Sequence, residues 1–222
     1  MKKIRRPGLK KLIASCPHMR RIYDLGGYPP PRDRDGGFPA LLRTIVDQQV
    51  STQSGAAIWR RLEEGIGTVT PEAILKAGED GLRACGFSGP KAHYAGELAS
   101  AITTGALDLG ALDGQSDEAA QAALVQIKGI GRWTAEIYLM FSLNRPDVWP
   151  AGDLALVVAA QHLLGLPSRP TADEMDALSE QWRPWRTTAA IMLWHYYRHM
   201  KPGAGGEPGR SPLKPRQRTS NT

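Results

Sequence analysis

The sequence has only two cysteines, Cys16 and Cys85, and they lie 69 positions apart. Two such thiols cannot build a disulfide framework or the four-thiolate site of a zinc ion or iron–sulfur cluster. Long apolar runs are also lacking, because no uncharged stretch approaches the roughly 18 to 20 residues of a membrane helix. The basic start of the chain is not followed by the apolar stretch of a signal peptide. We therefore expect a protein of a reducing cytoplasm.

Strand signals are scarce as well, since no segment alternates apolar and polar residues for long and β-branched residues do not cluster. Helical spacing is found instead. In 38–48, FPALLRTIVDQ, four aliphatic residues fall on one helical face. Ser51 is the predicted N-cap of the next helix, which we expect to be closed by Gly65, and a well-buried last helix is expected over 185–200. The fold class predicted by these patterns is all-α.

Positive charge is concentrated at the two ends of the chain. The first 21 residues contain eight Lys or Arg and no acid, and the last 22 contain five against Glu207 alone. Because the formal net charge of the whole chain is +6, the part between the ends is acidic. Basic ends on an acidic body favour a polyanionic partner, with nucleic acid first, although tails that only aid solubility have the same charges. Residues 201–222 are rich in proline and glycine and are predicted to be a disordered basic tail.

The most informative segment is 116–143, which reads SDEAAQAALVQIKGIGRWTAEIYLMFSL. One helix is predicted before Gly129 and a second after Gly131, so that Ile130 fills the interface of a tight hairpin. The amides of Gly129, Gly131 and Arg132 then point outward from the start of the second helix, where they can bind a phosphate. The alternative is an ordinary helical corner that uses glycine for its geometry. The longer pattern L-x-x-I-x-G-I-G-x-x-T-A favours the DNA-binding interpretation.

This pattern resembles the helix–hairpin–helix of the DNA glycosylase superfamily that also carries a Gly/Pro-rich loop and an aspartate. The resemblance rests on IKGIGRWTA at 127–135 and WPAGD at 149–153, with further matches at 37–52, 85–94 and 182–198. Within that superfamily the sequence is most similar to the alkylated-base branch, the 3-methyladenine DNA glycosylase II type.

The resemblance implies an all-helical, two-lobed fold with the active site in the cleft between the lobes. We expect residues 1–35 to pack with the C-terminal lobe, residues 36–145 to form a middle lobe that ends in the hairpin, and residues 146–200 to form the C-terminal lobe. Members of the family often hold a monovalent cation, K⁺ or Na⁺, at hairpin carbonyls, which here would be those of Ile127 and Gly129. No cofactor is required for the implied reaction, and no iron–sulfur cluster is expected.

Asp153 is the expected catalytic residue. On its own, an aspartate before LALVVAAQHLL is typical of a helix N-cap, and its place in the family motif favours catalysis. Amides at the helix start are expected to keep Asp153 ionised. By resemblance, this carboxylate stabilises the positive charge that develops on the sugar when an N-glycosidic bond breaks, and secondarily it activates the attacking water.

Trp133 occupies the position at which superfamily members that also cut the DNA backbone carry a nucleophilic lysine. A tryptophan cannot form a Schiff base, so a monofunctional glycosylase is implied. Its ring can stack on an electron-poor base, and core packing beside Ile137 is the alternative. Where alkylated-base members can carry a second aromatic residue, one turn further on, this chain has Ile137. Further candidates for walls of the base pocket are Trp149, Trp185 and Trp194.

Further DNA contacts are implied by the same resemblance. The wedge that fills the gap left by an extracted base falls in DQQVS, at Gln49 with Gln48 as its helper, whereas surface glutamines on an amphipathic helix are the alternative. Thr134 belongs to the DNA-binding residues of the hairpin. Lys91, in FSGPK, lies at a helix start and is expected to reach a phosphate, although a solvated surface lysine fits the same pattern.

The sequence therefore predicts a monofunctional DNA N-glycosylase that excises alkylated purines, of the 3-methyladenine and 7-methylguanine type, in base-excision repair. Its expected partner is double-stranded DNA with a damaged base. We expect a monomer in the cytoplasm, associated with the nucleoid through DNA and not with a membrane. Two alternatives stay open: a non-catalytic hairpin module that binds DNA without reading its sequence, and a glycosylase for deaminated or mismatched bases.

Overall fold

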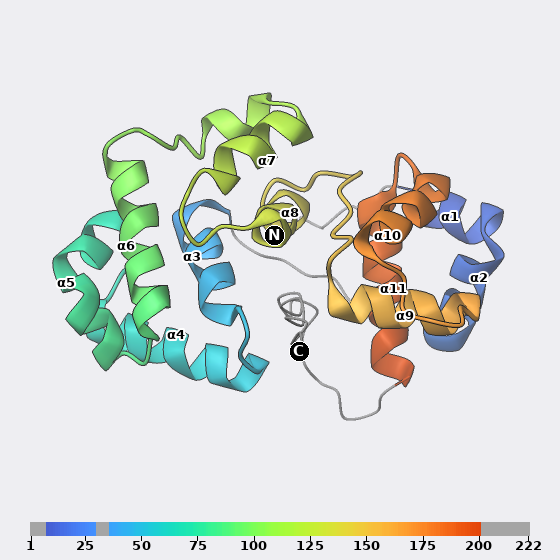
Figure 1. The fold of residues 1–222 in the computed structure, drawn as a ribbon, viewed down its shortest axis with the longest axis horizontal. Coiled ribbons are helices and arrows are strands. Elements are labelled where there is room, and N and C mark those ends of the chain that lie inside the picture. Colours follow the sequence, from blue (N-terminus) through green and yellow to red (C-terminus); the bar gives the residue numbers. More distant parts are fainter. Residues whose placement is uncertain (1–7, 30–35, 201–222) are drawn as a thin grey trace, which may run out of the picture.

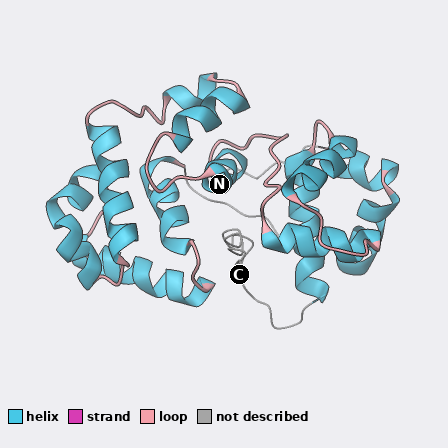
Figure 2. Ribbon diagram, viewed as in Figure 1, coloured by secondary structure: helices cyan, strands magenta, loops and turns pink. Residues whose placement is uncertain are grey.

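The computed structural model describes residues 8–29 and 36–200, and every regular element within those ranges is helical (Figure 2). The prediction of an all-α chain is therefore confirmed. The stretches 1–7, 30–35 and 201–222 lie outside the described residues, and with them the predicted tail. None of the described helices is long and apolar enough to cross a membrane.

Eleven α-helices and two short 3-10 helices follow one another in the described part of the chain. Their bounds are α1 (Leu9–Ser15), α2 (Pro17–Gly26), α3 (Gly37–Asp47), α4 (Thr52–Ile66), α5 (Pro71–Ala84), α6 (Gly89–Thr103), η1 (Ala111–Gly114), α7 (Asp117–Val125), α8 (Arg132–Phe141), α9 (Leu154–Leu164), α10 (Ala172–Ser179), η2 (Glu180–Trp182) and α11 (Arg186–Met200).

The helices form two groups that lie side by side (Figure 1). In one group α3 packs against α4, α6 and α8, while α5 covers α6 and α7 covers α8. In the other group α11 packs against α2 and α9, and α1 lies against α2. The amino-terminal helices thus join the carboxyl-terminal ones, and α8 lies near the middle of the molecule in this view. This is the two-lobed helical arrangement that the resemblance implies.

Hydroxyl side chains cap the start of five helices. Each accepts a hydrogen bond from the backbone amide three residues later, and they are Ser51, Thr70, Ser88, Ser116 and Thr171. Thr171 forms a complete capping box with the glutamate three positions on. Each such cap stabilises its helix by about 1 kcal/mol, so these boundaries are encoded locally.

Helix α4 ends one residue before Gly67, and not at Gly65 as predicted. Gly67 has φ +72, the left-handed region that favours glycine, and its amide donates to the carbonyl of Glu63. Gly65 lies within the helix, where a Cβ would press on the sulfur of Cys85. The helix therefore ends at the glycine whose backbone adopts a positive φ.

Helix α8 is buried on all sides, from Trp133 to Phe141. A helix without a polar face must be packed against other elements on every side, and α3 and α7 are two of these elements. The amide of Gly37 at the start of α3 also donates to the hydroxyl of Tyr138, at 3.2 Å. The helix that carries most of the motif residues is therefore fixed firmly within the fold.

The turn between α7 and α8 forms the predicted hairpin, with Ile130 only 4% exposed at the helix interface. Gly129 has φ +90, and a Cβ at this position would collide with the ring of Tyr94. Gly131 differs, because its φ is −88 and nothing lies within 4 Å of the place a Cβ would take. The fold therefore requires glycine at position 129 and leaves position 131 open.

We expect Gly129→Ala to lower the free energy of unfolding by about 2–4 kcal/mol, because alanine would have to adopt positive φ and displace Tyr94. Gly131→Ala is the matched control and should change the same free energy by less than about 0.5 kcal/mol. Urea denaturation of both variants measures the difference. Similar losses in the two variants would contradict the hairpin geometry.

Candidate active site

Asp153 lies at the start of α9 and is fully buried. Its Oδ1 accepts hydrogen bonds from the backbone amide of Leu156 and from Nε1 of Trp194, both at 3.0 Å. Its Oδ2 accepts a hydrogen bond from Nε1 of Trp133, also at 3.0 Å. The carboxylate is thus the N-cap of α9 and, at the same time, the acceptor for two indoles that come from α8 and α11.

Opposing effects act on the pKa of Asp153. Burial raises the pKa above its ordinary value, while the hydrogen bonds from Trp194, Leu156 and Trp133 lower it, and the net direction is upward. The helix-start amides therefore lower the pKa of Asp153, as the sequence predicts, but the desolvation of a side chain with no exposed surface outweighs them. The backbone amide of Leu156 and the indole N–H groups of Trp194 and Trp133 partly offset this desolvation.

Trp133 and Trp194 are the two predicted pocket aromatics that the structure brings to Asp153. Trp133 is almost fully buried, so it takes part in core packing and contacts the carboxylate as well. Ile137, one turn further along α8, is also buried in the core. Trp194 was only one of several candidate walls, because α11 is buried on every side and its periodicity does not single out one face.

Trp149 and Trp185 lie elsewhere. The ring of Trp149 packs against that of Trp182, with centroids 5.2 Å apart. The ring of Trp185 lies against Gly8, next to the start of α1, where it joins the amino-terminal helices to the second lobe. The indoles that donate to Asp153 are those of Trp133 and Trp194, and the predicted pocket roles of Trp149 and Trp185 stay predictions.

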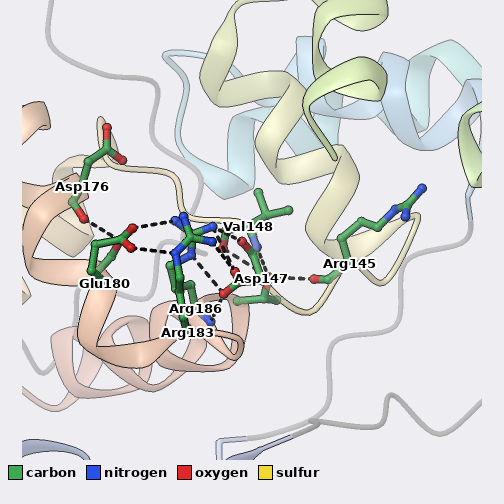
Figure 3. Close-up of polar contacts among 9 residues, drawn as sticks. Arg145, Asp147, Val148, Asp176, Glu180, Arg183 and Arg186 are labelled. Atoms are coloured by element: carbon green, nitrogen blue, oxygen red, sulfur yellow. Dashed lines mark hydrogen bonds and ion pairs between the residues drawn. The ribbon is translucent and has the colours of Figure 1, made fainter. Parts of the chain in front are cut away.

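The loop that leads to Asp153 is fastened to the start of α11 by ion pairs (Figure 3). Arg183 Nη1 lies 2.7 Å from Asp147 Oδ2, and Arg186 Nε lies 3.0 Å from Asp147 Oδ1. The backbone amide of Arg186 also donates to Asp147, so this aspartate binds the first residue of α11. The sequence analysis missed Asp147, because its partners lie more than thirty positions further along the chain.

Hydrogen bonds between the Thr187 side chain and backbone groups of the loop reinforce this connection. The Thr187 hydroxyl donates to the carbonyl of Arg145 at 2.7 Å and accepts the amide of Val148 at 3.0 Å. Arg145 and Val148, in the loop between α8 and α9, are therefore both bound through their backbones to one side chain of α11. The same helix carries Trp194, so the loop and the indole that contact Asp153 share one rigid support.

On the other side of α8, Gln48 joins the end of α3 to the hairpin. Its Nε2 donates to the carbonyl of Gly129 at 3.2 Å and to the hydroxyl of Thr134 at 3.0 Å. The next residue, Gln49, is exposed and has φ +55, which is rare for a residue with a side chain. The structure thus brings Gln48 and Thr134 together and leaves Gln49 as the exposed member of the turn.

Lys91 does not extend into solvent. Its Nζ donates to the carbonyls of Val46 and Gln48 at 2.7 and 2.6 Å, and burial lowers the pKa of this amine. The ammonium therefore binds the carboxyl end of α3, in place of the expected reach to a phosphate or the alternative of a solvated lysine.

The predicted phosphate-binding amides are free within the described residues. The N–H groups of Gly129, Gly131 and Arg132 donate to none of the carbonyl or side-chain acceptors there. The Arg132 side chain is engaged, since its Nε lies 2.7 Å from Glu136 Oε1 and its Nη2 lies 3.1 Å from Asp176 Oδ2. Helix α8 thus offers backbone donors at its start, while its first side chain ties it to α10 in the second lobe.

The carbonyls expected to hold a monovalent cation belong to the same turn. The Ile127 carbonyl accepts the amide of Ile130 at 3.0 Å, and the Gly129 carbonyl accepts from Gln48. A carbonyl oxygen has two lone pairs, so each keeps one for a further partner. These oxygens suit an alkali cation, which takes backbone carbonyls readily, and the cation remains a prediction.

A polar cavity of about 250 Å³ lies beside α8 and is lined by side chains of α7, α8, α10 and α11. Glu136 lines this cavity and is 3% exposed. Burial raises the pKa of Glu136 to about 7, against the lowering effect of the Arg132 guanidinium. The link between α8 and α10 therefore contains a carboxyl that titrates near neutral pH.

We expect wild-type stability to fall as the pH rises through about 7, because folded Glu136 binds its proton more tightly than the unfolded chain does. Glu136→Gln removes this titration. The free energy of unfolding of the wild type, relative to this variant, should drop by about 1 kcal/mol between roughly pH 6 and pH 8. Denaturant titrations at both pH values measure it. A constant difference would contradict the raised pKa.

A two-lobed helical fold, with a hairpin of free amides beside a buried, helix-capping aspartate, defines a helix–hairpin–helix DNA glycosylase architecture. Residues 42–184 match the family described as HhH-GPD superfamily base excision DNA repair protein. The match covers more than half of the chain, and the protein belongs to this family.

Relatives and solved structures support the same assignment. The chain is 37% identical over 181 residues to DNA-3-methyladenine glycosylase 1 of Schizosaccharomyces pombe, covering 79% of each protein. A solved 3-methyladenine DNA glycosylase of that yeast, in complex with abasic DNA, has a TM-score of 0.77 and 33% identity, over 84% of this chain and 94% of the other. A DNA-3-methyladenine glycosidase from Bacillus halodurans has a TM-score of 0.76 and 30% identity, over 86% and 89%.

Proposed function

We propose that this protein is a monofunctional DNA N-glycosylase that extracts an alkylated purine from duplex DNA and hydrolyses its N-glycosidic bond. The product is an abasic site, which enters base-excision repair. The observation that carries this proposal is the Asp153 carboxylate, held between two indoles in a chain whose relatives are named 3-methyladenine glycosylases. We further propose that the protein acts as a monomer and meets its substrate on the chromosome.

The geometry of Asp153 suits stabilisation of a cationic sugar. Positive charge develops on the sugar as the bond to the base breaks, and a nearby carboxylate in a low-dielectric site lowers the energy of that state. Trp133 and Trp194 hold both carboxylate oxygens, so the group need not reorganise when the charge appears. The base of an alkylated purine nucleotide is already cationic, so it takes the electron pair of the broken bond and leaves as a neutral molecule without the help of a strong general acid. Asp153 then orients the attacking water and accepts its proton.

The donors at Asp153 also support a reaction without strand cleavage. The side chains that donate to this carboxylate within the described residues are the indoles of Trp133 and Trp194. An indole cannot attack the sugar carbon to form a Schiff base. Water is therefore the proposed nucleophile, and the DNA backbone stays intact.

We propose that the hairpin holds the DNA through phosphates. The free amides of Gly129, Gly131 and Arg132 lie at the positive end of the α8 dipole, which favours an anion without reading sequence. Glycine at 131 is not required by the backbone, and a side chain there would project into open space. Gln49, exposed in the neighbouring turn, is the proposed wedge.

The alternatives are less favoured. A non-catalytic module has no need for a carboxylate that is fully buried and bound by two indoles, because such a group is costly to desolvate. The three similar proteins described above are named for 3-methyladenine and not for deaminated or mismatched bases.

The direct test is base release from methylated duplex DNA by the wild type and Asp153→Asn. We expect the variant to release 3-methyladenine at least about a hundredfold more slowly, because the carboxylate charge is lost. Strand breaks should appear only after alkali. Asp173→Asn, at an exposed position in α10, is the matched control and should keep the wild-type rate. Tight DNA binding by the wild type without release of any base would favour the non-catalytic module instead.

Gly131→Pro tests the hairpin amides. Proline lacks the N–H, and the φ of −88 at this position lies close to the value that proline requires. We expect affinity for any duplex to fall about tenfold, because one neutral donor to a phosphate is lost, without a change in the salt dependence that charged side chains set. Gly131→Ala retains the N–H and is the control, so fluorescence anisotropy titrations that give equal affinities for the two variants would count against phosphate binding at this amide.

A further inference from the structure

The turn between α3 and α4 carries the proposed wedge and is held from several directions. It connects the end of α3 at Asp47 to the cap of α4 at Ser51. Gln49 lies in the middle, exposed and with φ +55. A residue with a side chain adopts such a backbone conformation only when its surroundings enforce it. The contacts of the flanking residues therefore show what holds Gln49 in place.

The strongest of these contacts comes from α6. Lys91 Nζ donates to the carbonyls of Val46 and Gln48, the residues that lie three and one positions before Gln49. These carbonyls belong to the carboxyl end of α3, where partial negative charge favours a cation. The negative charge of Asp47 also acts on this ammonium. The half-buried Lys91 is thus bound to the side of the turn that α3 forms.

The position of Lys91 in its own helix shows that this contact is not incidental. Lys91 lies in the first turn of α6, where its amide donates to the cap Ser88. A positive side chain is disfavoured at the positive end of its own helix. Its ammonium is stabilised instead by the negative end of α3, so the residue serves the turn rather than α6.

Two further contacts complete the support. The Gln48 amide bridges to the hairpin at Gly129 and Thr134. On the α4 side, Gly55 lies so close to the Asp47 carboxylate that a Cβ would not fit. The turn is thereby fixed to α6 and to the hairpin and packs closely against α4, and the exposed Gln49 lies in its middle.

We propose that Lys91 is a positioning residue for base extraction: it binds the end of α3 and so holds Gln49 in the left-handed conformation that presents its side chain to the DNA stack. This inference rests on the proposed function. Because Gln48 ties the same turn to the phosphate-binding hairpin, docking of the hairpin on DNA places the wedge at a fixed distance from the bound phosphates.

The test measures wedge insertion separately from binding. The probe is a duplex with a tetrahydrofuran abasic analogue and a neighbouring 2-aminopurine, whose fluorescence rises when the stack is opened. With full-length Lys91→Met at saturating protein, we expect the fluorescence amplitude to fall to the level of Gln49→Ala. The rate of 3-methyladenine release at saturation should fall about tenfold, while affinity for undamaged duplex stays within about threefold.

The controls separate positioning from loss of charge or of fold. Lys76→Met removes an exposed lysine of α5 and should leave amplitude and rate unchanged. Lys91→Arg keeps the charge and should recover most of both. The double variant Lys91→Met/Gln49→Ala should be no slower than Gln49→Ala alone, within about twofold, because both changes disable the same wedge. If Lys91→Met does not fold, Lys91→Gln replaces it, and its amplitude must also fall.

Two results would overturn the inference. One is an unchanged fluorescence amplitude in Lys91→Met or Lys91→Gln while the variant binds duplex DNA more weakly. If the slope of log affinity against log salt concentration also falls by about the amount expected for one phosphate contact, Lys91 binds DNA directly. The other is a double variant whose rate loss is the product of the single losses. A wild type that releases no base overturns the proposed function, and this inference with it. A wild type that releases base beside fully active Lys91 variants overturns this inference alone.

Discussion

The buried carboxylate of Asp153 is the group on which the rest of the structure depends. A side chain with no exposed surface loses its hydration and must be compensated by donors from the protein. Those donors come from three helices: the Leu156 amide of α9, the Trp133 indole of α8 and the Trp194 indole of α11. Displacement of any one helix would remove one of these donors and leave the buried group less well compensated, so the position of this group links the two lobes.

Several other contacts follow from the need to hold these helices together. Asp147 binds Arg183 and Arg186 and so fastens the connection between α8 and α9 to the start of α11. Arg132 joins α8 to α10 through Asp176. Both contacts bridge the hairpin helix, or the loop that follows it, to the second lobe. The ion pairs and hydrogen bonds at the lobe junction thus add to the core packing that holds the proposed catalytic group in place.

Helix termini supply much of the electrostatics on the proposed DNA-binding side. The start of α8 leaves the amides of Gly129 and Gly131 free, which favours an anion. The end of α3 is occupied by the ammonium of Lys91. Gln48 connects these two termini. The proposed phosphate grip and the proposed wedge thus belong to one rigid unit, in which one helix end is left open for the substrate and the other is closed by a side chain.

Local features of this protein could be predicted from the sequence alone. The caps at Ser51 and Ser116, the hairpin at Gly129 and the helix start at Asp153 depend on hydrogen bonds and φ values within a few residues. Only the tertiary structure decided which tryptophan, in addition to Trp133, donates to Asp153. In a helix that is buried on every side, the spacing of apolar residues does not indicate which neighbour a given indole faces. The tertiary structure also decided the partners of Lys91 and the upward pKa shift of Asp153, since both depend on burial by segments far apart in the chain.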